Sequence, residues 1–274
     1  MAALHLSGSD NEAERERWEK LAETGDANAQ YRLGNIYENG WGVAVYPKSA
    51  AKWYLRAAVQ GHADAQYNLG IMYLNGRGVA QDAKEAAAWF LKAAKSGEKL
   101  SQCNLGALYD QGLGVPQDSG QALKWFLAAA NQGDAVAQYN LGIKYMFGTG
   151  TARDLAQAKT WLERSAQQGY AAAQYKLGWL YSSSESTSQD FDKAAHWFRL
   201  AAEQGEPIAL YALGVMTANG QSVPQDSVAA FALFTAAAEA GYRAALEARS
   251  QLEVAMTADQ IRRGQELAKS WKPR

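Results

Sequence analysis

The stretch AQYNLG at residues 65–70 decides the fold of this chain, because it recurs at a fixed spacing along the sequence. Related segments begin at residues 29, 101, 137, 173 and 209, where they read AQYRLG, SQCNLG, AQYNLG, AQYKLG and ALYALG. Each of the six segments begins 36 residues after the one before it, without an insertion. A fixed period of this length is typical of stacked copies of one supersecondary unit. The sequence therefore predicts a repeat array rather than a single globular core.

The copy that follows Gly61 indicates what each unit contains. The three-to-four spacing of a helix is seen in Ala65, Leu69, Met72 and Tyr73. Asn75-Gly76 can end this helix, because glycine readily takes the left-handed backbone conformation of a C-terminal cap. A second helix is expected to begin at the N-cap Asp82 and to run to about Ser96. Its inner side carries Ala86, Trp89, Phe90, Ala93 and Ala94. Each copy is therefore predicted to be a helix pair.

Three positions recur in nearly every copy and predict how the helices pack. The N-cap position holds Asp10, Asp82, Asp118, Asp154, Asp190 and Asp226, whereas the first full copy has Tyr46 followed by Pro47. An aromatic position that should fill the core holds Trp53, Trp89, Trp125, Trp161 and Trp197. A glycine inside the first helix recurs as Gly34, Gly70, Gly106, Gly142, Gly178 and Gly214. Since such a glycine costs about 1 kcal/mol, we expect a neighbouring helix where its side chain would be.

The pattern resembles the Sel-one-like repeat family, a relative of the tetratricopeptide repeat. In the copy from Ser101 to Gly133 the resemblance is carried by Leu105-Gly106, Tyr109, GLGVPQD at 112–118, Ala122, Trp125-Phe126 and Ala129-Ala130. The resemblance implies an all-α, right-handed superhelical α/α solenoid. It also implies a role as an adaptor or scaffold for other proteins.

The repeat period sets the expected boundaries. Residues 1–9 are expected to be flexible and residues 10–274 to form a single solenoid. Within it, residues 10–25 would be an N-terminal cap helix and residues 242–274 a C-terminal cap, in which Thr257 and Gln260 read as a capping box. The repeats are placed near 26–61, 62–97, 98–133, 134–169, 170–205 and 206–241. The serine-rich segment 182–188 replaces the usual Gly-x-Gly turn and is expected to be a mobile surface loop.

Composition excludes several classes of partner. The 27 basic and 28 acidic residues nearly cancel and form no basic stripe, which argues against nucleic acid. No apolar run is long enough for a membrane span, and the N-terminus lacks the pattern of a signal peptide, so we expect a cytoplasmic protein. The single Cys103 stands where the other five copies have Tyr, and is expected to be packed. The oligomeric state is not indicated.

No catalytic constellation is visible, and we expect neither a metal nor a cofactor. Ser49 and Lys52 fit the S-x-x-K pattern of penicillin-recognising enzymes. Both occupy variable positions of second helices, and no S-D-N motif accompanies them. A hydrolase of β-lactam or peptidoglycan-like substrates is therefore the alternative to a non-enzymatic scaffold. An inhibitor or immunity-type protein that blocks one effector is the third hypothesis.

A partner polypeptide is expected on the concave face, which first helices line in the resembled architecture. Positions there vary between copies, as a surface matched to an irregular partner would. The predicted partner-binding residues are Asn35, Ile71, Leu74, Asn75, Asp110, Ile143, Met146, Phe147 and Trp179. The alternative is that some of the large apolar side chains pack between repeats. The recurring tyrosines, among them Tyr67 and Tyr175, are expected to pack between repeats.

Overall fold

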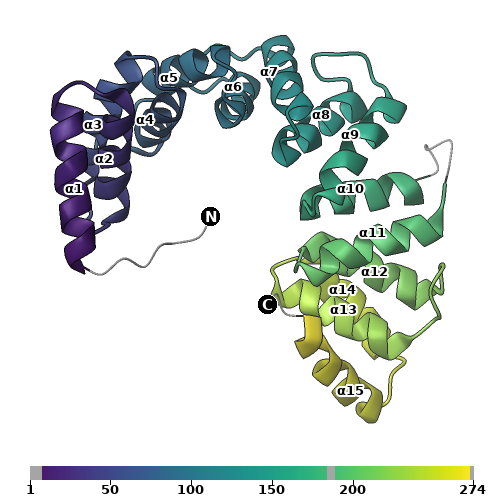
Figure 1. Ribbon diagram of the computed structural model, residues 1–274. Coiled ribbons are helices and arrows are strands. Elements are labelled where there is room, and N and C mark those ends of the chain that lie inside the picture. Colours follow the sequence, from purple (N-terminus) through teal and green to yellow (C-terminus); the bar gives the residue numbers. More distant parts are fainter. Residues whose placement is uncertain (1–7, 184–188, 272–274) are drawn as a thin grey trace. The chain divides into compact units, whose positions relative to one another are not determined.

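The computed structural model describes residues 8–183 and 189–271, and over these residues it is all-helical, without a strand (Figure 1). The first helices of the copies are α2 (Ala27–Asn39), α4 (Ala63–Asn75), α6 (Lys99–Gln111), α8 (Ala135–Phe147), α10 (Ala171–Ser182) and α12 (Pro207–Asn219). The second helices are α3 (Pro47–Val59), α5 (Ala83–Lys95), α7 (Ser119–Asn131), α9 (Leu155–Gln167), α11 (Phe191–Glu203) and α13 (Ser227–Glu239). The remaining elements are α1 (Gly8–Glu23), α14 (Ala244–Glu253), α15 (Ala258–Ala268) and the 3₁₀ turn η1 (Lys269–Trp271).

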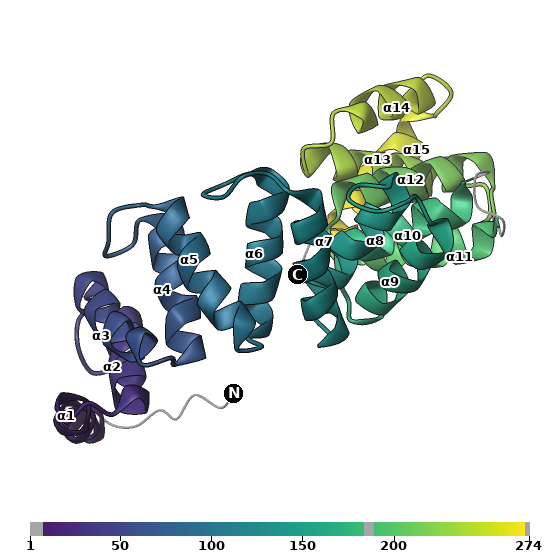
Figure 2. The same ribbon diagram turned by 90° about the horizontal axis from the view of Figure 1, so that it is seen from above.

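The helices form two compact units, the first ending at Asp134 and the second beginning at Ala135. In the first unit, α3 packs against α2 of its own copy and against α4 of the next, and α5 joins α4 to α6 in the same way. The succession of helices in this unit can be followed in Figure 2. In the second unit, α9 and α11 make the corresponding contacts. A single solenoid over residues 10–274 stays a prediction.

The glycine inside each first helix lies against a ring or a leucine of its partner helix. A Cβ built on Gly70 would lie 2.6 Å from Cε1 of Phe90, which is fully buried. The same contact joins Gly34 to Tyr54, Gly106 to Phe126, Gly142 to Leu162, Gly178 to Phe198 and Gly214 to Phe234. The close neighbour expected at these glycines is therefore confirmed, and it is the side chain that follows the tryptophan position. Trp89, Trp125 and Trp161 are buried beside it, while Trp53 and Trp197 are half-buried.

Helix caps follow the predicted pattern in the second helices. Asp82, Asp118, Asp154 and Asp226 each accept two backbone N–H groups of the first turn, and Asp190 accepts one. Tyr46, at the equivalent position before α3, makes no such bond. The first residue of α3 is Pro47. The first helices have a cap that the sequence reasoning missed, at the residue after the closing glycine. There Asp26, His62 and Glu98 accept N–H groups of α2, α4 and α6.

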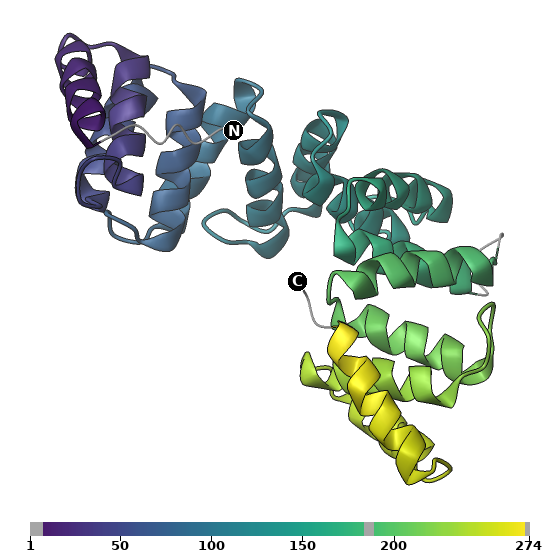
Figure 3. The same cartoon turned by 60° about the horizontal axis from the view of Figure 1, so that its bottom comes forward.

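The two ends of the array differ in how well they were predicted. Helix α1 begins at Gly8, so the assignment of Asp10 as an N-cap is wrong, because Asp10 lies inside the first turn of the helix. Of residues 1–9, which were predicted to be flexible, residues 1–7 lie outside the described part of the chain, whereas Gly8 and Ser9 belong to α1. Residues 184–188 of the serine-rich loop also lie outside it. The capping box of Thr257 and Gln260 is confirmed. In Figure 3 the yellow helix α15 lies across the green helices before it, and Gly264 of α15 contacts the ring of Phe231 in α13.

Candidate functional site

In the first unit, the predicted site residue Asn35 belongs to a closed polar network. The hydroxyl of Tyr54 lies 2.8 Å from Oδ1 of Asn35 and 2.6 Å from Oε2 of Glu38. The guanidinium of Arg77 pairs with the Glu38 carboxylate at 3.3 Å and donates to the Glu38 carbonyl at 3.1 Å. Burial, followed by the bond to Glu38, raises the pKa of Tyr54, so the phenol stays protonated. Asn35 therefore has partners within the protein itself.

The other predicted residues of the first unit divide between packing and solvent. Ile71 and Leu74 are half-buried and pack against the core cluster around Phe90 and Leu105. Asp110 is half-buried, and Asn75, at the end of α4, is exposed. The packing alternative therefore describes Ile71 and Leu74 better than a role as free contact residues.

In the second unit, the structure separates neighbouring residues that the sequence placed together. Met146 is only 2% exposed and belongs to the core, so its assignment to the partner surface is wrong. It packs in one cluster with Leu177, Leu180 and Tyr181 of α10, because the end of α8 turns this position toward the next copy. Phe147, one residue later, is 61% exposed, and Trp179 is 37% exposed.

Trp179 lines a cavity of ≈ 460 Å³ between α10 and α12. The residues that line it belong to α10, α11, α12, the turn after α12 and the start of the C-terminal cap. The lining residues are Tyr175, Trp179, Ser182, Phe191, Phe198, Ile208, Tyr211, Ala212, Val215, Met216, Gln221 and Tyr242. None of these residues is charged, and six of them are aromatic. We call this cavity the aromatic pocket.

The aromatic pocket stands where the first unit has its polar network. Trp179, Ser182, Phe198 and Gln221 lie four repeat periods after Asn35, Glu38, Tyr54 and Arg77, in the same order. In the first unit, these four positions bond to one another and to the chain. In the second, large apolar and short uncharged side chains leave a cavity. Equivalent positions of the repeat therefore form a site whose polar groups bond to one another in the first unit, and an open apolar site in the second.

Several pocket residues were missed by the sequence reasoning. The tyrosines at positions 175 and 211 were interpreted as packing between repeats, and their rings do lie 5.9 Å and 5.6 Å from Phe198 and Phe234. Tyr211 also lies 5.1 Å from Tyr242, the residue after a closing glycine. Burial raises the pKa of Tyr175, so its hydroxyl is a neutral donor. One signal was present in the sequence. Tyr170 and Tyr242 stand at the position after the closing glycine, where other copies carry Asp, Glu or His.

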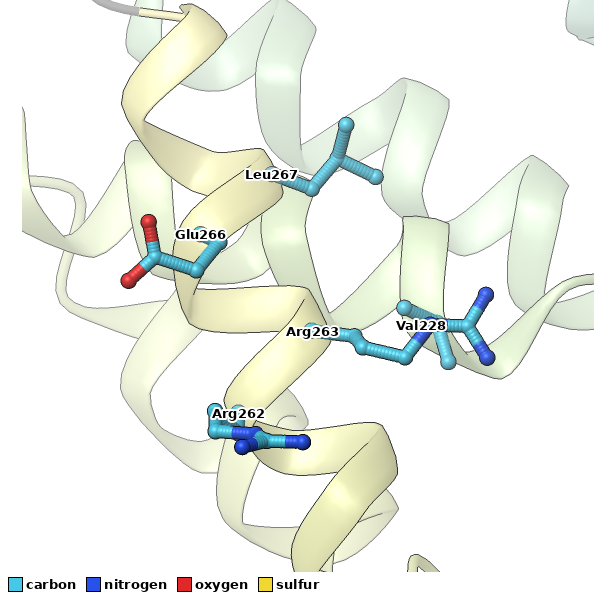
Figure 4. A pocket seen from close by; sticks show the side chains of 5 residues that line it. All are labelled: Val228, Arg262, Arg263, Glu266 and Leu267. Atoms are coloured by element: carbon cyan, nitrogen blue, oxygen red, sulfur yellow. The ribbon is translucent and has the colours of Figure 1, made fainter.

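A second cavity, of ≈ 560 Å³, lies beside the capping helix α15 (Figure 4). It is lined by Val228 at the start of α13 and by Arg262, Arg263, Glu266 and Leu267 of α15. In Figure 4 the Arg263 side chain extends toward Val228, while Glu266 points away. Arg262 is paired with Asp259 at 2.5 Å and Glu266 with Lys269 at 2.8 Å. This cavity is an open, charged surface of the cap, unlike the aromatic pocket.

The residues whose side chains could bind a metal or take part in catalysis are dispersed over the described helices. Within the described ranges, no group of three or more His, Cys, Asp or Glu side chains has an arrangement that holds a metal. His62 caps α4 and stacks on Tyr31 at 4.5 Å. Burial, together with the nearby Asp134 carboxylate, raises the pKa of the Cys103 thiol to about 12. Ser49 is half-buried and Lys52 exposed, both on α3.

Among the described helices, none has both the length and the apolar character that a membrane span requires. None of the proteins with curated functions matches this chain.

Comparison with solved structures gives a close relative in fold. A protective antigen of uropathogenic Escherichia coli strains, which displays an SLR fold, aligns with a TM-score of 0.85 and 33% identity over 94% of this chain. The alignment covers 56% of the antigen, so this chain spans little more than half of that protein's length. A Sel1 repeat protein from Oxalobacter formigenes aligns with a TM-score of 0.75 and 25% identity, over 89% of this chain and 97% of that one.

The model of the Sel1 repeat matches residues 27–62, 63–98, 99–134, 135–170, 171–206 and 207–242. These six segments begin one residue after the boundaries expected from the sequence. Each contains one helix pair in which the glycine of the first helix lies against a ring or, in the fourth repeat, against Leu162. The chain is therefore a member of the Sel1 repeat family, with six consecutive repeats between the helix α1 and the helices α14 and α15.

Proposed function

We propose that this protein is a scaffold that binds a partner polypeptide, and that the aromatic pocket receives one apolar side chain of that partner. The observation that carries the proposal is the open, uncharged cavity of ≈ 460 Å³ beside Trp179. Cavities of this size, lined by aromatic residues with a few polar groups, are typical of binding sites. The Sel1 repeat is generally a unit of protein–protein interaction, and the chain's six repeats support the same class of function.

The chemistry of the lining favours a neutral occupant. A charged side chain would lose its hydration in the pocket without meeting an opposite charge, which is costly. An aliphatic or aromatic side chain would instead contribute about 25 cal/mol for each Å² of apolar surface that leaves water. Tyr175, Tyr211 and Gln221 place hydroxyl and amide groups at the same cavity, where they can bond the partner's backbone.

Phe147 extends the apolar surface of this unit. It is 61% exposed at the end of α8, in a position where the first unit has the polar residues Asn39, Asn75 and Gln111. Exposed aromatic anchors of this kind often dominate the binding energy of protein interfaces. Phe147 and Trp179 are therefore the residues whose removal should weaken capture of a partner most.

The test is affinity capture from native lysate with the parent protein and with Phe147→Ala combined with Trp179→Ala. We expect the variant to lose the specific partner while its helicity and melting temperature stay close to those of the parent. Val254→Ala is the matched control, because Val254 is 89% exposed in the same unit but lies outside the pocket. Capture that persists in the double variant, or that the control also removes, would contradict the proposal.

A further inference from the structure

At four exposed positions the first full repeat has a residue that is larger or more apolar than those of the other five. Trp41 stands where later copies have Arg77, Leu113, Thr149 and Gln221, and Val59 where they have Lys, Asn, Gln or Glu. Val45 replaces Gln or Arg, and Tyr46 replaces Asp in every other copy. The four side chains are 57%, 67%, 51% and 54% exposed, in the order given. Tyr46 packs edge-on against Tyr37, with ring centroids 6.4 Å apart, but more than half of each of the four side chains stays exposed. Exposed apolar side chains that gather in one place often mark a functional surface.

Two of these replacements remove hydrogen bonds that the other copies make. In later turns the residue aligned with Val45 donates to the carbonyl seven residues before it, as Gln81 does to Leu74 at 2.9 Å and Gln117 to Asp110 at 2.8 Å. The residue aligned with Tyr46 is the aspartate that caps the second helix. The first turn has neither bond, and instead presents Trp41, Val45 and Tyr46 to solvent. The first turn therefore lacks two local hydrogen bonds of the later turns and exposes three large side chains at its end.

Helix α3, which follows this turn, carries cations on its exposed side. Lys48, Lys52, Leu55 and Val59 succeed one another at spacings of four, three and four residues, which places them on one face of the helix. All four are exposed, and neither lysine makes an ion pair within the described residues. Arg56 lies beside this face with its guanidinium over the Trp53 ring. The face is therefore both basic and apolar.

No acidic residue interrupts this surface in the sequence. Between Glu38 and Asp64 the chain has three cations, Lys48, Lys52 and Arg56, and no Asp or Glu. Glu38 itself is paired with Arg77 and with the Tyr54 hydroxyl. The acidic helix α1 packs against α2. We define the basic-apolar surface as Trp41, Val45, Tyr46, Lys48, Lys52 and Val59.

We propose that the basic-apolar surface docks on an anionic lipid membrane, as a second binding activity that is independent of the aromatic pocket. Trp and Tyr are enriched at the membrane–water interface, because their rings are apolar and their N–H or O–H groups stay in contact with water. Lysines beside them attract the negative charge of anionic headgroups. The turn would place Trp41, Val45 and Tyr46 among the headgroups, while Lys48 and Lys52 lie against the phosphates.

A lipid surface explains this composition better than a protein partner does. Lysine is depleted at protein–protein interfaces, whereas faces that lie on membranes combine lysines with Trp and aliphatic residues. The two lysines here are exposed and unpaired among the described residues, at the edge of an apolar tip. Charge complementarity therefore points to an anionic, interfacial occupant.

The test is sedimentation of the full chain with vesicles of equal parts phosphatidylglycerol and phosphatidylcholine, compared with vesicles of phosphatidylcholine alone. We expect binding to the anionic vesicles only, and weaker binding as salt is raised. Each of Lys48→Gln and Lys52→Gln should weaken binding about fivefold. Trp41→Gln with Val45→Gln and Tyr46→Asn should weaken it about tenfold or more.

The triple variant has a built-in control for folding. Val45→Gln restores the side-chain hydrogen bond to the carbonyl seven residues before it, and Tyr46→Asn restores a side chain that can cap α3. This variant should therefore melt no lower than the parent. Val254→Ser, which removes an exposed apolar side chain of the second unit outside the aromatic pocket, should leave vesicle binding unchanged. Failure to bind anionic vesicles, equal binding to both vesicle types, or binding to an acidic polypeptide such as polyglutamate in place of vesicles would overturn the proposal.

Discussion

The side-chain amide of Gln132 donates to Oε1 of Gln102 at 2.8 Å, and Gln102 is buried between three helices. The amide of Gln102 in turn donates to the carbonyl of Ala94 at 3.1 Å. One pair of glutamines therefore links α6 to the end of α7 in its own copy and to α5 in the copy before. The same amide contact, at 2.8 Å, joins Gln60 to Gln30, Gln168 to Gln138 and Gln204 to Gln174.

Two copies lack this pair, in different ways. The sixth has Leu210 and Ala240, so both polar groups are absent together. The second keeps Gln66 but has Ser96 in place of the donor, and Oε1 of Gln66 is buried without a partner in the described structure. A buried acceptor with no donor costs free energy, whereas the loss of both partners can be nearly neutral. The second copy is therefore a local defect that one substitution can repair.

Ser96→Gln should stabilise the protein by about 1 kcal/mol, because its amide would donate to the unpaired oxygen of Gln66. Ser96 has φ −82° and ψ 2°, nearly the conformation of Gln60 and Gln132, so the backbone accepts the longer side chain. The measurement is the midpoint of urea unfolding. Ser96→Ala, which adds no donor, is the control and should show no gain. An unchanged midpoint in Ser96→Gln would show that water already satisfies Gln66.

Ser101→Ala should also stabilise the protein by about 1 kcal/mol. Ser101 is fully buried where the other five copies have alanine, and its hydroxyl finds no partner within the described residues. The reciprocal change, Ala65→Ser, introduces the same defect one copy earlier and should cost a similar amount. Both effects can be measured by calorimetry. Equal melting temperatures for all three proteins would refute this assignment.

Gly70→Ala should destabilise the protein, although alanine is the better helix former. Its Cβ would lie 2.6 Å from the buried Phe90 ring, and such overpacking costs roughly 1–3 kcal/mol, more than the gain of about 1 kcal/mol in helix propensity. Gly120→Ala is the matched control, because Gly120 also lies in a helix but faces only the Asp118 carboxylate. The control should be neutral or stabilising in the same unfolding assay. A stable Gly70→Ala protein would show that the ring moves aside freely.

The Cys103 thiol should react slowly with thiol reagents near neutral pH as long as the chain is folded. Burial and the nearby Asp134 raise its pKa to about 12 from an ordinary 9.0, and the thiolate is the reactive form. Because the unfolded chain loses this proton at lower pH than the folded chain, its contribution to stability is present below pH 9.0 and is lost as pH rises toward about 12. Cys103→Ala should therefore lose part of the alkaline decline in stability. Rapid labelling of the folded protein would contradict the burial of this thiol.

The aromatic pocket should close when it receives the residues of the first unit. Trp179→Asn, Ser182→Glu, Phe198→Tyr and Gln221→Arg together transfer the network that bonds Asn35, Glu38, Tyr54 and Arg77. Since this set folds in the first unit, we expect the variant to stay helical by circular dichroism and to lose partner capture. Phe198→Tyr alone, which leaves the cavity open, is the control. Undiminished capture by the quadruple variant would place the binding site elsewhere.

The glycine and aspartate positions show how much of the fold was predictable. Gly70 and Asp82 have counterparts every 36 residues because nearly every copy repeats the contact that each makes, a ring against the helix for Gly70 and a capped helix end for Asp82. Periodicity therefore identified helices, caps and close packing correctly. It failed at Asp10, because α1 is not the second helix of a helix pair in the described chain and begins two residues earlier, at Gly8.

The residues of the binding surface were less predictable. Met146 and Phe147 are adjacent, apolar and similar in sequence context, yet one is buried and the other exposed. Their difference depends on which side of α8 meets α10, and that side is set by side chains a full repeat away. Residues of this face vary between copies, so the repeat pattern carries no information about their burial.

The sequence by itself determined a helical array of six repeats, the ends of its second helices and the tight contacts at its glycines, because those features depend on residues at constant offsets. Only the tertiary structure decided that Asn35 is enclosed by Tyr54 and Glu38 while Trp179 borders an open pocket. The physical reason is that a cavity depends on the combined volume and polarity of side chains from several helices. Equivalent positions carry Asn35, Glu38, Tyr54 and Arg77 in the closed network, and Trp179, Ser182, Phe198 and Gln221 at the apolar pocket.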